Sequence, residues 1–157
     1  MKKTMKKVLS LVLVMMVISC TLLLSACQQD KLVIETPETE PETNLVITED
    51  LVIIKTTQEM MGGATEMTLM DYMSKLKDKG ELEFVIRDGM ITSINGVENP
   101  ADYSSCWMLY TSDADNANVA WGTVEYEGKE YGSAISGAET LKIKADQLYI
   151  WVYKSFS

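Results

Sequence analysis

The chain has 157 residues, 46% of them hydrophobic and 24% charged, with a formal net charge of −9. It contains no histidine, which excludes imidazole general bases, Ser-His-Asp and Cys-His nucleophile systems, and histidine-ligated metals. The acidic balance argues against nucleic acid as a partner, because phosphate binding needs a surface of Lys and Arg. The sequence therefore predicts no enzyme, no metal and no bound cofactor.

The N-terminal segment has the pattern of an export signal. Four lysines within the first seven residues precede an apolar run over 8–24, which ends in Leu-Ser-Ala-Cys at 24–27. This pattern resembles the bacterial lipobox, whose cysteine is acylated and becomes the N-terminus after cleavage. The resemblance implies a signal peptide over 1–26, lipid on Cys27 and a location on the extracytoplasmic side of the cell membrane. The alternative is a transmembrane helix over 8–26, which is just long enough to span a bilayer.

Residues 27–44 are expected to form an extended linker. Their centre, 36–43, consists of proline, threonine and glutamate, and charge and proline both favour an extended chain. All 23 acidic residues but only 10 of the 14 basic ones follow residue 26, so the mature chain has a formal charge of 10 minus 23, or −13. That charge repels anionic lipid headgroups, so the domain is expected to stand away from the bilayer.

The remaining residues, 45–157, are expected to form one domain. Strand-forming residues over 45–57 open it, and a glycine pair at 62–63 follows. Thr68 is a suitable helix N-cap, and Leu69, Met73 and Leu76 then fall on one helical face. Gly80 suits the left-handed position that ends such a helix.

From residue 81 onward the pattern alternates with the period of strands. It predicts a hairpin of 82–86 and 90–94 around the Asp88-Gly89 turn, followed by a loop over 97–105 and a strand over 106–111. A polar connection over 112–118 then leads to a hairpin over 121–131. Two further strands are expected over 141–144 and 148–153. The last strand is apolar on both faces, which is typical of a central, covered strand. One helix among six or more strands indicates an α+β fold.

Three segments resemble the transcobalamin-like C-terminal domain family. They are Ile-Thr-Ser-Ile-Asn-Gly-Val at 91–97, Trp-Met-Leu-Tyr at 107–110, and the stretch 137–153. The family includes the small domain of the animal cobalamin carriers and many single-domain bacterial surface lipoproteins. The resemblance implies a β-grasp-like mixed sheet with one packed helix, and a cobalamin or other corrinoid as a possible ligand. In the carriers this domain supplies half of the site, and this chain lacks the helical domain that supplies the other half.

Trp107, Tyr110 and Trp121 are the candidate ligand-binding residues, because they flank the segment where the family's ligand-facing hairpin lies. Aromatic faces stack on flat macrocycles or sugar rings, although such residues in a small domain also serve core packing. The acidic stretch from Asp113 to Asn118 fails as a calcium loop, because its sixth position is Asn118 instead of glycine and its twelfth is Val124 instead of glutamate. A polar turn is the expected alternative.

The only cysteine after position 27 is Cys106, which is expected in a strand as a small apolar group. The predicted function is a lipid-anchored cell-surface protein with a small non-catalytic ligand-binding domain. The alternative is a surface module for protein–protein or glycan interaction, that is, adhesion. Possible partners are the membrane, a corrinoid or a surface protein.

Overall fold

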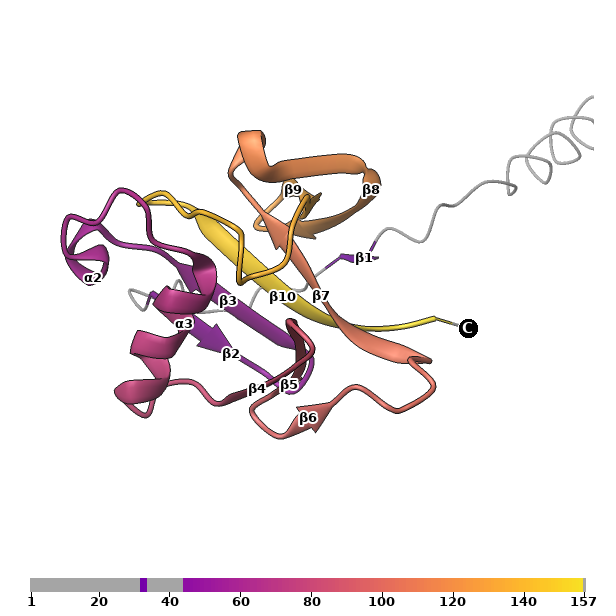
Figure 1. Cartoon of the computed structure of the whole chain (residues 1–157). Helices are drawn as coiled ribbons and strands as arrows, with labels where there is room; N and C mark the ends of the chain where they lie inside the picture. Colours follow the sequence, from indigo (N-terminus) through magenta and orange to yellow (C-terminus); the bar gives the residue numbers. More distant parts are fainter. Residues whose placement is uncertain (1–31, 34–43, 157) are drawn as a thin grey trace, which may run out of the picture. The chain divides into compact units, whose positions relative to one another are not determined.

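The computed structural model describes residues 32–33 and 44–156, so the predicted signal peptide, Cys27 and most of the predicted linker lie outside the described residues. The described part is a mixed α+β fold with mostly antiparallel strands (Figure 1). Its strands are β1 (Leu32–Val33), β2 (Leu45–Ile47), β3 (Leu51–Lys55), β4 (Phe84–Arg87), β5 (Met90–Ile94), β6 (Val97–Glu98), β7 (Ser105–Thr111), β8 (Ala117–Tyr126), β9 (Lys129–Ala134) and β10 (Leu148–Ser155). Its helices are α2 (Gln58–Met61), α3 (Leu69–Asp78) and the short 3-10 helix η2 (Ala114–Asn116).

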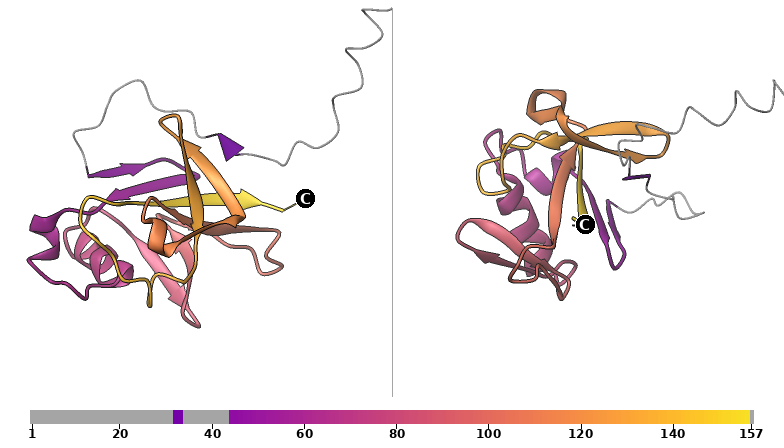
Figure 2. Two further views of the ribbon diagram at one scale, coloured as in Figure 1. Left: turned by 90° about the horizontal axis from the view of Figure 1, so that it is seen from above. Right: turned by 90° about the vertical axis from the view of Figure 1, so that its right-hand side faces the viewer.

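Seven strands form the main sheet in the order β1-β8-β9-β7-β10-β3-β2, and β4, β5 and β6 form a smaller one. The strand β10 pairs antiparallel with β7 on one side and β3 on the other, which confirms the prediction that the last strand is central. In the main sheet the pair β1–β8 is parallel. The helix α3 and the smaller sheet lie on the same side of the main sheet (Figure 2).

The helix α3 begins and ends as the sequence predicts. The Thr68 hydroxyl accepts a hydrogen bond from the Asp71 amide, and the Asp71 carboxylate accepts one from the Thr68 amide, so the capping box is complete. Hydrogen bonds to this carboxylate lower the pKa of Asp71. At the other end Gly80 has φ of 72°, a conformation that costs glycine little. The buried face includes Leu69, Met73 and Leu76.

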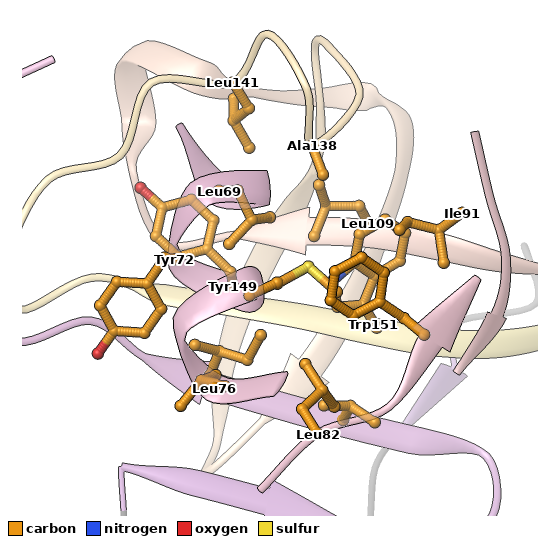
Figure 3. Close-up of a cluster of buried hydrophobic side chains, with 14 of the residues drawn as sticks. Leu69, Tyr72, Leu76, Leu82, Ile91, Leu109, Ala138, Leu141, Tyr149 and Trp151 are labelled. Carbon is orange, nitrogen blue, oxygen red and sulfur yellow. The ribbon is translucent and has the colours of Figure 1, made fainter. Parts of the chain in front are cut away.

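Two hydrophobic clusters lie on opposite faces of the main sheet. The first packs under α3 and the smaller sheet, and Figure 3 shows part of it, including Leu69, Leu109 and Trp151. The second comprises Leu51, Ile53, Tyr110, Val124, Tyr126, Tyr131, Ile150 and Val152. Alternate residues of β10 enter the two clusters, because successive side chains of a strand point to opposite faces. The sheet is therefore covered on both faces at its centre.

The segment 141–144 is not the strand that its alternating pattern predicts. It makes only an isolated bridge, between Thr68 and Lys142. Leu141 and Ile143 are buried in the cluster under α3, while hydrogen bonds run from the Leu69 amide to the Leu141 carbonyl and from the Ile143 amide to the Met67 carbonyl. The apolar alternation here reflects packing against the start of the helix, and no ladder forms along it.

Other differences are short elements that the sequence pattern does not reveal. The strand β6 lies in the stretch expected to be a loop and pairs with β5 through two residues. The helix α2 follows the N-cap Thr57. The two residues of β1 fall inside the expected linker and pair with Val124 and Glu125 of β8.

Candidate functional site

Trp107 lies in β7 on the face of the sheet that carries α3. Its side chain is 6% exposed, and its indole N–H donates a hydrogen bond of 2.9 Å to the Val97 carbonyl oxygen. Its ring lies 5.4 Å from the Tyr153 ring, centroid to centroid, at an interplanar angle of 57°. Both polar and apolar parts of this side chain are therefore engaged inside the domain.

Tyr110 lies on the opposite face of the same strand and is 2% exposed. It belongs to the second cluster and pairs across the sheet with Ile150 and Ser133. Burial, followed by the effect of Cys106, raises the pKa of the Tyr110 hydroxyl. The sheet thus separates Tyr110 from Trp107.

Trp121 is the exposed member of the three, because β8 is interrupted where it occurs. Asn118 pairs with Ser133 and Thr123 pairs with Gly132, so residues 119–122 of β8 have no partner on the continuous strand β9. This extra length is a β-bulge of four residues, which we call the 119–122 bulge. Val119 is 68% exposed and Trp121 61% exposed on it.

The backbone of the 119–122 bulge is constrained by a hydrogen bond to Asn118 and by close contact with β9. The Asn118 side-chain oxygen accepts a hydrogen bond of 2.9 Å from the Ala120 amide. Gly122 has φ of 119°, a region that side-chain-bearing residues avoid. The backbone at 118–119 passes so close to Gly132 that a Cβ there would lie 3.1 Å from the Asn118 carbonyl carbon and from the Val119 nitrogen. Glycine is required where two backbones approach this closely.

The segment that contains the 119–122 bulge carries no charged side chain of its own, since no Asp, Glu, Lys or Arg occurs over 116–124. A water-facing tryptophan beside an exposed valine offers an apolar face that can stack on a flat ring. What sequence reasoning missed is the 119–122 bulge itself, although an isolated glycine in a strand pattern, Gly122, is a known signal for one.

The polar turn before β8 is closed by its own interactions. The buried Asp113 carboxylate accepts hydrogen bonds from Lys144 Nζ at 2.8 Å and from the Asn116 side-chain nitrogen at 2.7 Å. Burial tends to raise the pKa of Asp113, but these bonds and one from the Asp115 amide outweigh it and lower the pKa. Within the described ranges, no group of three or more Cys, Asp or Glu residues is arranged to hold a metal ion. The geometry is that of a polar turn with a structural ion pair.

Cys106 lies in β7, as predicted, and is half-buried. Burial raises the pKa of its thiol, so the sulfur is protonated at neutral pH and is a poor nucleophile. Its nearest polar contact is the Met108 sulfur at 3.6 Å. The environment suits a small packing residue.

Comparison with known proteins adds no relative, since no family model, curated protein or solved structure matches the chain. Within residues 32–33 and 44–156, no helix is long and apolar enough to cross a bilayer. The candidate site is therefore defined by its own geometry, with Trp121 at the 119–122 bulge and Trp107 and Tyr110 in two separate cores.

Proposed function

We propose that this chain is a bacterial cell-surface protein, anchored by lipid on Cys27, whose β-grasp-like domain binds a ligand without transforming it. The proposed ligand is a corrinoid, and the contact is the 119–122 bulge. The observation that carries the proposal is the exposure of Trp121 and Val119 on a bulge whose backbone is fixed by Asn118 and Gly132. An exposed indole held on a rigid support loses little conformational entropy on binding.

Stacking chemistry supports a flat ligand. A tryptophan face of this kind covers one side of a conjugated macrocycle, and the corrin ring is such a surface. The resemblance of 91–97, 107–110 and 137–153 to the transcobalamin-like domain supplies the choice of a corrinoid over other flat molecules. Because the 119–122 bulge desolvates only one side of the ring, the isolated domain is expected to bind weakly.

Three features support binding without catalysis. The sequence has no histidine, and the thiol of Cys106 has a raised pKa that keeps it protonated. The buried carboxylate of Asp113 is already engaged by Lys144 and Asn116. The thiol of Cys106 is therefore less suited to act as a nucleophile, and the carboxylate of Asp113 is less suited to act as a general base.

The test is a titration of the full-length chain, purified in detergent, with cobinamide and with cobalamin. We expect a saturable change in the visible spectrum and a higher melting temperature at millimolar ligand, because a ligand that binds only the folded state stabilises it. Trp121→Ala should weaken binding by about tenfold, which corresponds to about 1.4 kcal/mol.

Tyr103→Ala is the matched control, because Tyr103 is also an exposed aromatic side chain, 54% accessible, but lies outside the 119–122 bulge. It should bind as the unaltered chain does. An unchanged spectrum and an unchanged melting temperature with both corrinoids would exclude a corrinoid ligand.

A second candidate, a protein-interaction or adhesion module, is favoured by the edge of the main sheet. The strand β2 has no further strand beyond it in the described part of the chain. The Asn44 carbonyl and the Thr48 amide bond to β3, so by the antiparallel alternation Ile47 directs its backbone groups outward. An exposed edge of this kind can accept a partner strand.

The adhesion candidate is tested with Ile47→Pro, which removes an outward N–H and leaves the β2–β3 ladder intact. Loss of whole-cell adhesion with unchanged folding would support it. Ile47→Thr keeps the N–H and serves as the control. Equal adhesion by both variants would rule out strand addition at β2.

A further inference from the structure

An open groove of about 430 Å³ lies on the face of the main sheet opposite α3. It is separate from the 119–122 bulge, none of whose residues lines it. One side is formed by the sheet, including Val46, Ile53 and Leu148, and the other by the β8–β9 hairpin, including Tyr126 and Tyr131. Its volume falls within the range of small-molecule sites.

The sheet side of the groove includes two pairs of residues that lie opposite each other on neighbouring strands. Val46 pairs with Ile53, and Lys55 pairs with Leu148. Residues two apart on a strand share a face, so Ile53 and Lys55 point to the same side. The groove therefore has an aliphatic floor with an ammonium group beside it.

The β8–β9 hairpin forms the opposite wall of the groove, because β9 pairs with β7 along only a short part of its length. The strands β7 and β9 pair only through Tyr110–Ser133 and Thr111–Gly132. The rings of Tyr126 and Tyr131 join Ile53 in the second cluster, which places this end of the hairpin over the sheet face. Aromatic rings thus face aliphatic side chains across the groove.

The two tyrosine hydroxyls remain protonated. Burial, a hydrogen bond with Glu127 and its charge raise the pKa of Tyr126 to about 12. Burial first, and then the charge of Glu127, raises the pKa of Tyr131. A neutral phenol can both donate and accept a hydrogen bond.

Charges of both signs surround the groove and are not paired with one another. Lys55, Lys129, Glu127 and Asp146 are all exposed, and the ion pairs found among the described residues involve none of them. Two ammonium groups and two carboxylates around an aromatic and aliphatic groove complement a ligand with one charge of each sign and an apolar body.

From this arrangement we propose that the groove is a second binding site, whose ligands are short zwitterionic peptides of two or three residues. The ammonium groups of Lys55 and Lys129 bind the peptide carboxylate, and the carboxylates of Glu127 and Asp146 bind its amino terminus. An apolar peptide side chain contacts Ile53 and the tyrosine rings. The site is independent of corrinoid binding and of the lipid anchor.

The experiment uses the ¹⁵N-labelled full-length chain in detergent and the dipeptide leucylphenylalanine as the probe. We expect saturable shifts of the amide signals of Lys129, Tyr131 and Lys55 at millimolar peptide. The N-acetylated, C-amidated form of the same dipeptide should give shifts at least tenfold weaker at equal concentration, because both of its charges are removed. Equal binding by the capped peptide, or no saturable shift with either peptide, overturns the proposal.

Two sets of variants locate the site. The double variant Lys55→Gln, Lys129→Gln should weaken binding about tenfold, while Lys154→Gln, away from the groove lining, should not. Asn44→Trp places an indole at an exposed rim position and should block the peptide, whereas Glu49→Trp in the β2–β3 turn should not. If Asn44→Trp binds the dipeptide normally, the groove is not the site. Cobinamide titration of Asn44→Trp should be unchanged, which separates this result from any failure of corrinoid binding.

Discussion

At the scale of single residues, Asp113 is a buried carboxylate that holds the turn before β8. Its side chain is 4% exposed, whereas that of Asp115, which bonds the same lysine, is 84% exposed. A buried carboxylate that loses its charge becomes a weaker acceptor for its donors, and hydrogen bonds to charged groups contribute about 1.5–3 kcal/mol. An exposed pair contributes less than about 1 kcal/mol.

Asp113→Asn should therefore lower the free energy of unfolding by about 1–3 kcal/mol. The loss arises because the buried acceptor of Lys144 loses its charge, and only the exposed Asp115 carboxylate is left as a charged partner. Urea denaturation followed by circular dichroism measures it. Asp115→Asn is the matched control and should change stability by less than about 1 kcal/mol; equal losses in both variants would mean that burial of Asp113 does not strengthen its pair.

The same residue predicts a dependence of stability on pH. The pKa of Asp113 is lowered in the folded protein, so its contribution is present above the ordinary carboxylate range and is lost as the pH falls through the folded pKa, below about pH 4. Asp113→Asn should flatten this part of the acid unfolding profile. Melting temperatures of both proteins between about pH 2 and pH 7 provide the test, and parallel curves would contradict it.

The aromatic candidates show which part of the site the sequence pattern could resolve. Trp107 and Tyr110 are three positions apart on one strand, and an odd separation places side chains on opposite faces. Their separation was therefore predictable, as was the burial of the β10 residues. The exposure of Trp121 was not, because it depends on the register in which β8 pairs with β9.

At the scale of elements, local signals account for what the sequence predicts well. The capping box of Thr68 and Asp71 and the Asp88-Gly89 turn act within a few residues. Asp88 and Gly89 have φ of 51° and 78°, as a two-residue hairpin turn requires. The segment 141–144 contacts residues 67–69, which are distant in the sequence, so a local pattern does not reveal its partners. The strand β6 pairs with its neighbour β5 through only two residues, which is too short for an alternating pattern to show.

Thr68→Ala should destabilise the domain by about 1 kcal/mol, because it leaves the Asp71 amide without its acceptor. Thermal unfolding gives the measurement. Ser74→Ala, within the same helix, is the control. Its hydroxyl only bonds the Met70 carbonyl, and alanine favours helices, so stability should stay equal or rise. A Thr68→Ala protein as stable as the unaltered chain would show that the cap contributes nothing.

Gly132→Ala should displace the 119–122 bulge. The added Cβ would meet the Asn118 and Val119 backbone at 3.1 Å, so one of the strands must move, at a cost of about 1–3 kcal/mol. The Trp121 indole signal in an NMR spectrum should shift with the loss of stability. Gly137→Ala is the control, because no atom lies within 4 Å of a Cβ there. An unshifted indole signal in Gly132→Ala would mean that Gly132 does not position the 119–122 bulge.

At the scale of the whole molecule, the described part of the chain has two separate candidate surfaces. The 119–122 bulge and the groove share the strands β8 and β9, yet none of the bulge residues lines the groove. Residues 27–157, the proposed mature chain, have a formal charge of −13, which repels anionic headgroups. The proposed lipid on Cys27 would supply the attachment that this charge opposes.

Cys27→Ser tests that anchor directly. The hydroxyl cannot form the thioether that holds the lipid, so the variant should lose labelling by a radioactive fatty acid and should no longer partition with the membrane fraction. Two acyl chains, at about 0.8 kcal/mol per buried methylene, hold a protein stably at a bilayer, and their loss leaves an acidic domain with no comparable affinity. Cys20→Ser, within the same apolar run, is the matched control and should keep both label and location. Retention of Cys27→Ser in the membrane without label would instead favour a transmembrane helix over 8–26, since such a helix holds the chain without lipid.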